Sequence, residues 1–376
     1  MGNEFLSMKR IAREALPILV DNLVAPNLFY QNYSNDFANV GDTIQVKKPP
    51  IFEAKSFDQS SGVDVQDVKT SKVDVTMDQL DDVSVEVTSK ELSLDIDDFN
   101  AEVTEPAAVA LAEKINKSGL KLYKDIPYFS GTAGTTPSGL ADLANIRRIM
   151  NENKVPTSMR RVVWDTYADA ELTQVDALVH AEKADSPRAL REAQIGRVYG
   201  LENYFSQAVA VHEAGTYTEN DDVEADGTAS AGDETIDLVS STSDSDDGGD
   251  TLVEGDVFTL NNYKYTVTSE EEEADDDGKI TVDIYPALQA DVADEDDVDF
   301  ETDHTANLGF HRNAFAFVSR SLPLPSDKDA YTVSYGGITL RAVYGYDMKY
   351  KKNMLSFDIL YGYKTLYPEL AVRYLG

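Results

Sequence analysis

The stretch Leu308-Gly309-Phe310-His311-Arg312-Asn313-Ala314-Phe315-Ala316-Phe317-Val318 is rich in aromatic and aliphatic side chains and predicts strand structure inside a core. A second strand-like stretch, Tyr204-Phe205-Ser206-Gln207-Ala208-Val209-Ala210-Val211, precedes it. Residues 213–305, which separate the two, carry 2 basic and 31 acidic side chains, a net charge of −29. The whole chain of 376 residues carries −35, so the remainder is close to neutral. We therefore expect one nearly neutral domain interrupted by an inserted acidic module, residues 213–305.

The acidic module has strand character of its own. Apolar and polar residues alternate at 235–239, 256–260, 263–267 and 279–285, which predicts a small β domain. Asn261-Asn262 separates two of these strands at the spacing of a two-residue hairpin, and Asp277-Gly278 favours a turn into the last strand. The segment from Ser241 to Gly249 is expected to be disordered, because it consists of Ser, Thr, Asp and Gly.

The part of the chain before the module mixes helices with extended segments. Apolar spacing predicts a helix over 4–25, with a kink at Pro17, and a long extended pair formed by 39–57 and 68–92. A hairpin with polar faces buries little by itself, so we expect it to lie on a neighbouring subunit or domain. A helix is expected to begin at Thr104-Glu105-Pro106, with Ala108, Leu111, Ile115 and Leu122 on its apolar face.

Further elements follow in quick succession. Residues 131–134 predict a loop, and a helix with Leu140, Leu143, Ile146 and Met150 on its apolar face comes next. Arg160-Arg161-Val162-Val163-Trp164 predicts a strand, and Asp165 is expected to begin a helix that continues through Leu172, Val175 and Val179. Strands are expected to dominate from Tyr331 to Tyr374. The mixture indicates the α+β class.

Several function classes are excluded or disfavoured by composition. The chain has no Cys, which excludes disulfides and thiolate chemistry, and it has four His, at positions 180, 212, 304 and 311. Neither a phosphate-binding loop nor a dinucleotide-binding glycine pattern, nucleophile elbow or His-Glu-x-x-His motif is present. No apolar run is long enough to cross a membrane as a helix. His311, beside Arg312, is interpreted as a structural histidine because no partner carboxylate accompanies it. We therefore predict no catalytic residues and no cofactor.

Two acidic runs in the module have partial calcium-loop spacing. The first, from Glu273, has acids at loop positions one, three and five and Gly at position six, but Ile284 stands where an EF-hand needs Glu. The second, from Ser243, has Glu254 at position twelve but Ser at positions one and three. An ordinary acidic turn is the alternative for both runs. The candidate cation ligands are Asp244, Asp246, Asp247, Glu254, Asp275 and Asp277.

The order of these elements resembles the major capsid proteins of tailed double-stranded DNA viruses, in the branch with an inserted β-rich domain. The resemblance rests on Arg160-to-Trp164 followed by a helix, on residues 195–206 (Ile-Gly-Arg-Val-Tyr-Gly-Leu-Glu-Asn-Tyr-Phe-Ser), on 307–317, and on Gly337-Ile338-Thr339-Leu340-Arg341. It extends over essentially the whole chain. It implies an N-terminal arm (1–38), an extended hairpin loop (39–102), a spine helix with the first part of the apical and peripheral domains (103–212), the inserted domain (213–305) and closing strands (306–376).

The resemblance also implies a role. A subunit of this family is a structural protein that self-assembles, as hexamers and pentamers, into an icosahedral head enclosing double-stranded DNA without sequence specificity. Its location would be the virion, with assembly in the host cytoplasm, and its partners a portal, a decoration protein and, because the arm helix is predicted from residue 4, a separate scaffolding protein. A net charge of −29 on each module is tolerated best in brine, where the Debye length at 1 M salt is roughly 3 Å, so we expect an outward-facing module and a halophilic host.

Two other hypotheses stay open at the level of sequence. A non-viral compartment shell shares the fold but would enclose enzymes in place of DNA. A cell-surface acidic protein for calcium binding or adhesion would suit the acidic loops and the 20 Tyr, although the first six residues lack the layout of a secretory signal.

Overall fold

The structure is a computed structural model that describes residues 8–31, 42–47, 72–86, 99–179, 195–220, 222–240, 249–325, 329–347 and 352–376. The chain divides into two compact units. Unit 1 comprises Met1–Leu23, Gln31–Ala112 and Ala316–Leu366, and unit 2 comprises Val24–Tyr30, Glu113–Phe315 and Tyr367–Gly376. Each unit is therefore assembled from three separate pieces of chain. Helices and strands occur together in both, which confirms the predicted α+β class.

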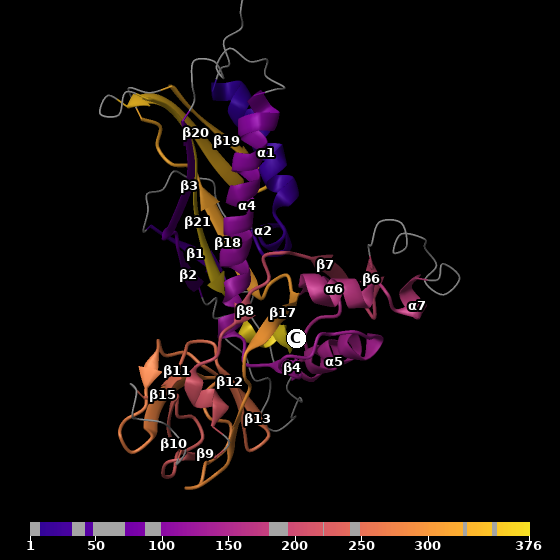
Figure 1. Ribbon diagram of the computed structural model, residues 1–376, viewed down its shortest axis with the longest axis vertical. Coiled ribbons are helices and arrows are strands. Elements are labelled where there is room, and N and C mark those ends of the chain that lie inside the picture. Colours follow the sequence, from indigo (N-terminus) through magenta and orange to yellow (C-terminus); the bar gives the residue numbers. More distant parts are fainter. Residues whose placement is uncertain are drawn as a thin grey trace, which may run out of the picture. The chain divides into compact units, whose positions relative to one another are not determined.

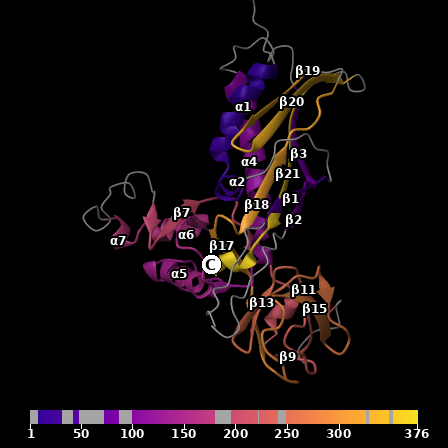
Figure 2. The same ribbon diagram turned by 180° about the vertical axis from the view of Figure 1, so that it is seen from behind.

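Unit 1 contains an antiparallel sheet in the order β18-β21-β20-β19, with β3 also paired to β21. The bounds of these strands are Gln79–Glu86 (β3), Phe315–Arg320 (β18), Asp329–Tyr335 (β19), Ile338–Asp347 (β20) and Lys352–Thr365 (β21). Helix α1 (Met8–Asn22) packs against β19 and β20 (Figures 1 and 2). Its buried side chains are Met8, Ile11, Ala12, Ala15, Leu16 and Leu19. The amphipathic spacing that predicted this helix therefore serves to cover a sheet.

The predicted extended pair is present in its first part. Strand β1 (Thr43–Lys47) and strand β2 (Lys72–Thr76) form a two-stranded antiparallel sheet in which Lys47 lies opposite Lys72. Residues 48–71, which join the two strands, lie outside the described residues.

The second arm of that pair is not continuous, and this corrects the expectation for 68–92. Beyond β2, strand β3 joins the sheet of unit 1, where Val83 lies opposite Phe357 and Val85 opposite Leu355. Leu355 and Phe357 are buried, so the alternating valines of β3 extend an apolar face within their own chain. This part of the arm therefore needs no neighbouring subunit for its pairing.

A π-helical turn, Asn100–Thr104, leads into helix α4 (Glu105–Leu120), whose start agrees with the prediction. Ala108, Leu111 and Ile115 are buried, as expected. Leu122 lies beyond the helix in a 3₁₀ turn, η3 (Lys121–Asp125).

Unit 2 is centred on a mixed sheet in the order β4-β22-β17-β5-β7-β6, with β8 also paired to β17. The strands are Phe129–Gly131 (β4), Arg160–Trp164 (β5), Arg197–Val198 (β6), Leu201–Phe205 (β7), Val211–His212 (β8), His304–His311 (β17) and Ala371–Leu375 (β22). Helices α5 (Leu140–Glu152) and α6 (Thr166–Leu172) share a buried core with the sheet that includes Ile146, Trp164 and Leu201. Two short helices, α2 (Ala25–Leu28) and α7 (Asp176–Val179), also belong to this unit.

A predicted helix and a predicted strand of this unit are shorter in the structure than expected. The helix that begins after Asp165 ends at Leu172, because Thr173 Oγ1 and Gln174 Nε2 both bond the carbonyl of Ala170, and α7 is separate. The strand-like stretch 204–211 is broken after Phe205 by a turn in which Ser206 Oγ accepts a hydrogen bond from the amide of Ala208. The start of α6 is as expected, since the Asp165 carboxylate accepts from the amides of Tyr167 and Ala168.

The stretch 308–318, predicted as strand, also contains a turn. Strand β17 ends at His311 and β18 begins at Phe315, with the amide of Ala314 donating to the carbonyl of His311 between them. The polar pair Arg312-Asn313 marks the turn that divides the two strands.

The acidic module folds around a core of its own within unit 2. Its six-stranded sheet has the order β16-β12-β13-β15-β10-β9, and a second sheet pairs β11 with β14. The strands are Val223–Ala225 (β9), Thr235–Ser240 (β10), Thr251–Leu252 (β11), Val257–Leu260 (β12), Tyr263–Val267 (β13), Glu272–Glu273 (β14), Lys279–Tyr285 (β15) and Val298–Phe300 (β16), gathered in one group in Figure 1. All four predicted strands are present, whereas β9, β11, β14 and β16 were not predicted.

The two predicted turns of the module are also confirmed. Asn261 and Asn262 have φ values of 53° and 64°, the left-handed pair that a type I′ hairpin requires. Gly278 has φ 72° and ends the turn into β15. Residues 241–248, expected to be disordered, lie outside the described residues. The five domain ranges proposed from the sequence stay predictions.

Candidate functional site

The stem of the acidic module is the place where the chain enters and leaves it, formed by β8 and the start of β17. His212 pairs with His304 across these antiparallel strands, and their ring centroids lie 5.1 Å apart. Both imidazoles are buried. The chain thus leaves and re-enters the sheet of unit 2 at neighbouring positions.

Arg373 of β22 lies beside this stem with no exposed surface. Its NH1 donates to the carbonyl of Gly255 at 2.7 Å and its NH2 to the carbonyl of Tyr123 at 2.6 Å. Its guanidinium carbon lies 4.8 Å from the centroid of the Tyr123 ring. Burial lowers the pKa of Arg373 to about 10, so the group is cationic at neutral pH. The arginine connects the closing strand, turn η3 and the acidic module.

His304 faces that arginine. Its Nδ1 lies 2.7 Å from the carbonyl oxygen of Thr302, which only accepts, so Nδ1 carries the hydrogen and Nε2 is the unprotonated nitrogen. Nε2 lies 3.5 Å from Arg373 NH1. Burial, and then the charge of Arg373, lower the pKa of His304 to about 3. His304 is therefore neutral at physiological pH.

His212 and Asp256 complete the cluster. His212 Nε2 lies 2.8 Å from Asp256 Oδ1, and its Nδ1 lies 3.0 Å from the hydroxyl of Tyr123. The carboxylate of Asp256, which has no exposed surface, also accepts from the amides of Val253 and Gly215. Burial raises the pKa of Tyr123 to about 12. We call these five residues, Tyr123, His212, Asp256, His304 and Arg373, the stem cluster.

A second set of contacts fixes the β12–β13 hairpin of the module to the same region. Lys264 Nζ donates to the carbonyl of Phe129 at 2.5 Å and lies 3.8 Å from the centroid of its ring. Thr266 Oγ1 donates to the carbonyl of Lys124, and Val257 forms a small buried cluster with Phe129 and Leu375. Residues 213–305 contain two basic side chains, and one of them is thus used for attachment. The module is a docked part of unit 2.

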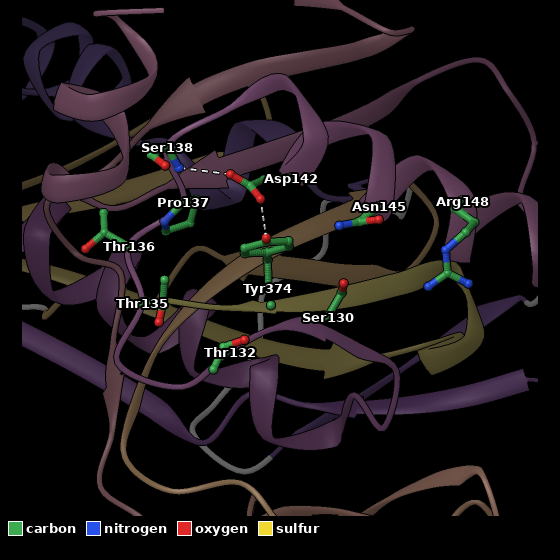
Figure 3. A pocket seen from close by; sticks show the side chains of 11 residues that line it. Ser130, Thr132, Thr135, Thr136, Pro137, Ser138, Asp142, Asn145, Arg148 and Tyr374 are labelled. Atoms are coloured by element: carbon green, nitrogen blue, oxygen red, sulfur yellow. Dashed lines mark hydrogen bonds between the residues drawn. The ribbon is translucent and has the colours of Figure 1, made fainter.

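A polar pocket of about 420 Å³ is lined by β4, the loop 132–138, helix α5 and Tyr374 of β22 (Figure 3). Tyr374 Oη donates to Asp142 Oδ1 at 2.6 Å, while Asp142 Oδ2 accepts from the amides of Ser138 and Gly139. Asp142 thereby caps α5. Arg148, at the rim, is paired with Glu152 at 2.7 Å. The charged groups of the pocket are occupied in holding the loop and the helix end.

Two of the candidate cation ligands that the structure describes, Asp275 and Glu254, are engaged otherwise. Asp275 Oδ1 accepts from the amides of Asp277 and Lys279, both at 2.9 Å, and Glu254 is paired with Lys124 at 3.1 Å. This is the geometry of an acidic turn. Within the described ranges, no three His, Asp or Glu side chains are grouped to hold a metal ion. Asp244, Asp246 and Asp247 lie outside these ranges, so cation binding there stays a prediction.

His311 is a buried structural histidine, as interpreted from the sequence. Its Nδ1 accepts from the amide of Asn313 at 3.2 Å in the turn between β17 and β18. Burial, with Arg161 and Arg160 nearby, lowers the pKa of His311. His180 lies outside the described residues. Among the helices described, none is long and apolar enough to cross a membrane.

The sequence did not predict the stem cluster. The one available signal was Arg373 itself, which interrupts the apolar run Ala371-Val372-Arg373-Tyr374-Leu375. Arginine is seldom fully buried without partners, so its place in a central strand indicates a buried polar network. Its partners come from η3, the module and the stem, and a single sequence does not reveal that they meet.

The sequence matches no protein-family model and no curated protein. Solved structures with a similar chain fold are known. A chain of Mycobacterium phage Che8 is 14% identical, with 94% of this chain and 90% of that chain covered and a TM-score of 0.45. The capsid of cyanophage P-SCSP1u is 11% identical, with 94% and 88% covered and a TM-score of 0.47. A virus-like particle from Pyrococcus furiosus is 9% identical, with 99% and 100% covered and a TM-score of 0.42. With all three TM-scores below 0.5 and identities of 14% or less, these likenesses concern the fold alone.

Proposed function

We propose that the protein is a capsid subunit that assembles into a closed shell around double-stranded DNA. The observation that carries this proposal is the order of elements along the chain. Helix α1, the extended pair β1–β2, the 16-residue helix α4, a mixed sheet and its closing strand β22 follow one another as the capsid resemblance implies. The chain contributes structure to the particle and performs no catalysis.

The β1–β2 pair supports a role in assembly. Within the described residues the two strands hydrogen-bond as a two-stranded sheet with no third strand. A two-stranded ribbon is marginally stable in water. Strand β2 packs on β21 of its own chain, with Val75 buried, and the ribbon gains further stability when another surface covers its other face. In a shell, that surface is a neighbouring copy of the chain. Subunits would thus be linked by residues 43–76, as hexamers and pentamers.

Charge supports an orientation for the acidic module. Residues 306–376 have a net charge of +4, whereas residues 213–305 carry −29. Packaged DNA repels the module and not the closing strands, so the module faces outward. At the roughly 3 Å Debye length of 1 M salt, repulsion between modules on neighbouring subunits is screened, which favours a halophilic host. A scaffolding protein, a portal and a decoration protein would be the partners, and the virion the final location.

Deletion of the hairpin connection tests the assembly role. The full chain and a variant lacking residues 48–71 are expressed and compared at 2 M and 0.1 M NaCl by sedimentation velocity. A variant lacking 241–248 in the module is the matched control. We expect the full chain and the control to sediment as large particles at high salt, and the hairpin deletion to remain a folded monomer.

Four outcomes would count against particular parts of the proposal. Equal assembly of the hairpin deletion would contradict the role of the β1–β2 segment. Particles that contain protein cargo and no nuclease-protected DNA would favour a compartment shell. A full chain that is monomeric at every salt concentration, with a melting temperature raised by calcium, would favour the cell-surface alternative. Intact and soluble shells at very low salt without divalent cations would remove the halophile inference.

A further inference from the structure

The stem cluster contains one ring nitrogen, Nε2 of His304, whose protonation would place a second positive charge beside Arg373. His304 Nδ1 donates to the Thr302 carbonyl, so Nε2 is the atom that takes up a proton. Nε2 lies 3.5 Å from NH1 of Arg373. That NH1 donates to the carbonyl of Gly255, and NH2 of the same guanidinium donates to the carbonyl of Tyr123. A proton at Nε2 would turn an acceptor into a cation directly opposite a buried cation.

The groups around this site do not neutralise such a charge. From β8, His212 faces His304, and from η3 Tyr123 lies against Arg373. Asp256 is the buried carboxylate, and it is engaged by His212 and by backbone amides. The remaining charged groups that act on the cluster are Asp125, Glu213 and Glu254, of which Glu254 is paired with Lys124. Proton uptake by His304 is therefore easiest when the cluster opens to water.

The module has a hydrophobic core of its own, which keeps it folded when the stem opens. Its own core, which includes Tyr217, Phe258 and Tyr265, is separate from the core of α5 and its sheet. Among the described residues, a small cluster of Phe129, Val257 and Leu375 provides apolar contact between the two. Opening the stem thus exposes little apolar surface compared with unfolding the module.

We propose that the stem cluster is an acid-sensitive latch, in which protonation of His304 opposite Arg373 releases the acidic module from β22 and η3 while the module stays folded. The released module would then move on its two chain connections at the stem. The latch is a property of the single chain and does not depend on shell formation.

The size of the effect follows from proton linkage. With a pKa of about 3 in the closed stem and 6.5 in an open one, the open population rises roughly 30-fold between pH 7.5 and pH 5.0. The lowered pKa of His304 determines the size of this 30-fold change, whereas the contacts of His304 with its neighbours place the opening at the stem.

Hydrogen exchange of the full chain, corrected for the intrinsic pH dependence, tests the latch. Peptides covering 120–130, 204–216, 253–260 and 371–376 are compared with the module core at 235–240 and 279–285, at pH 7.5 and 5.0. We expect faster exchange by about 30-fold at pH 5.0 in the first set, with the module core unchanged. His304→Gln is expected to reduce this ratio to within about threefold of unity, whereas His311→Gln, a buried histidine outside the stem, keeps it.

Three results would overturn the proposal. They are stem exchange in the parent protein that is independent of pH, loss of protection in the module core together with the stem, and an unchanged pH response in His304→Gln. If that variant does not fold, the imidazole signals of ¹⁵N-histidine-labelled parent protein replace it. A His304 ring that titrates near pH 6.5 without any change in stem exchange would equally contradict the latch.

Discussion

Replacement of Arg373 by methionine is expected to destabilise unit 2 by about 3–5 kcal/mol. The methionine retains apolar volume but donates no hydrogen bond, so the carbonyls of Gly255 and Tyr123 lose their charged donor in a buried site. Each unsatisfied buried acceptor costs about 1–3 kcal/mol, and the side chain that is removed has no exposed surface. The expected loss is therefore a large part of the stability of an ordinary domain.

Urea unfolding at pH 7.5, followed by fluorescence of Trp164, measures this change. Trp164 is the single tryptophan, is fully buried and belongs to the core of α5 and its sheet, so its emission reports on unit 2. Arg148→Met is the matched control, because Arg148 forms an exposed pair with Glu152 in which both side chains are 58% exposed. The control is expected to change stability by less than about 1 kcal/mol. A loss below about 1 kcal/mol for Arg373→Met would refute the view that this arginine holds the stem together.

Three further predictions concern the same unit. The free energy of unfolding should fall as pH decreases from 6.5 towards 3, by about 1.4 kcal/mol per pH unit from His304 alone. The reason is that the unfolded histidine binds a proton, whereas the folded one, with its pKa lowered to about 3, does not. Urea titrations of the parent and of His304→Gln should differ by that slope, and parallel curves would contradict the prediction. Lys264→Met should lower stability by about 1–2 kcal/mol, because the hydrogen bond to the Phe129 carbonyl is lost. The control Lys279→Met removes an exposed pair with Asp226 and should cost less than about 1 kcal/mol. Equal losses in thermal unfolding would argue against a docking role for Lys264. Asn262→Gly should leave the melting temperature unchanged or raise it, and Asn262→Val should lower it by several degrees, since φ is 64° there; a Val variant as stable as the parent would contradict the type I′ assignment.

Much of the local structure followed from the sequence because it depends on neighbours along the chain. The period-two alternation of β15, with Ile280, Val282 and Ile284 buried, and the Asn-Asn turn between β12 and β13 are local patterns of this kind. Asp165 was correctly placed at a helix start for the same reason, since its carboxylate accepts from the nearby amides of Tyr167 and Ala168.

The errors arose where a side chain bonds its own backbone and ends an element, or where segments far apart in the sequence pair. Ser206 and Thr173 bond their own backbone and end elements that apolar spacing would continue. Strand β3 was assigned to the hairpin, because its pairing with β21 joins residues far apart in the sequence. The stem cluster was missed for that same reason, as its five members come from five separate parts of the chain.

The most direct test of the central claim, that this chain is a shell subunit, is electron cryomicroscopy of the full-length protein purified at high salt. A shell subunit is expected to form closed particles with icosahedral symmetry, built from hexamers and pentamers, with the density of residues 213–305 on the outer surface. A monodisperse monomer, or an open oligomer of fixed small size under all salt conditions, would contradict it.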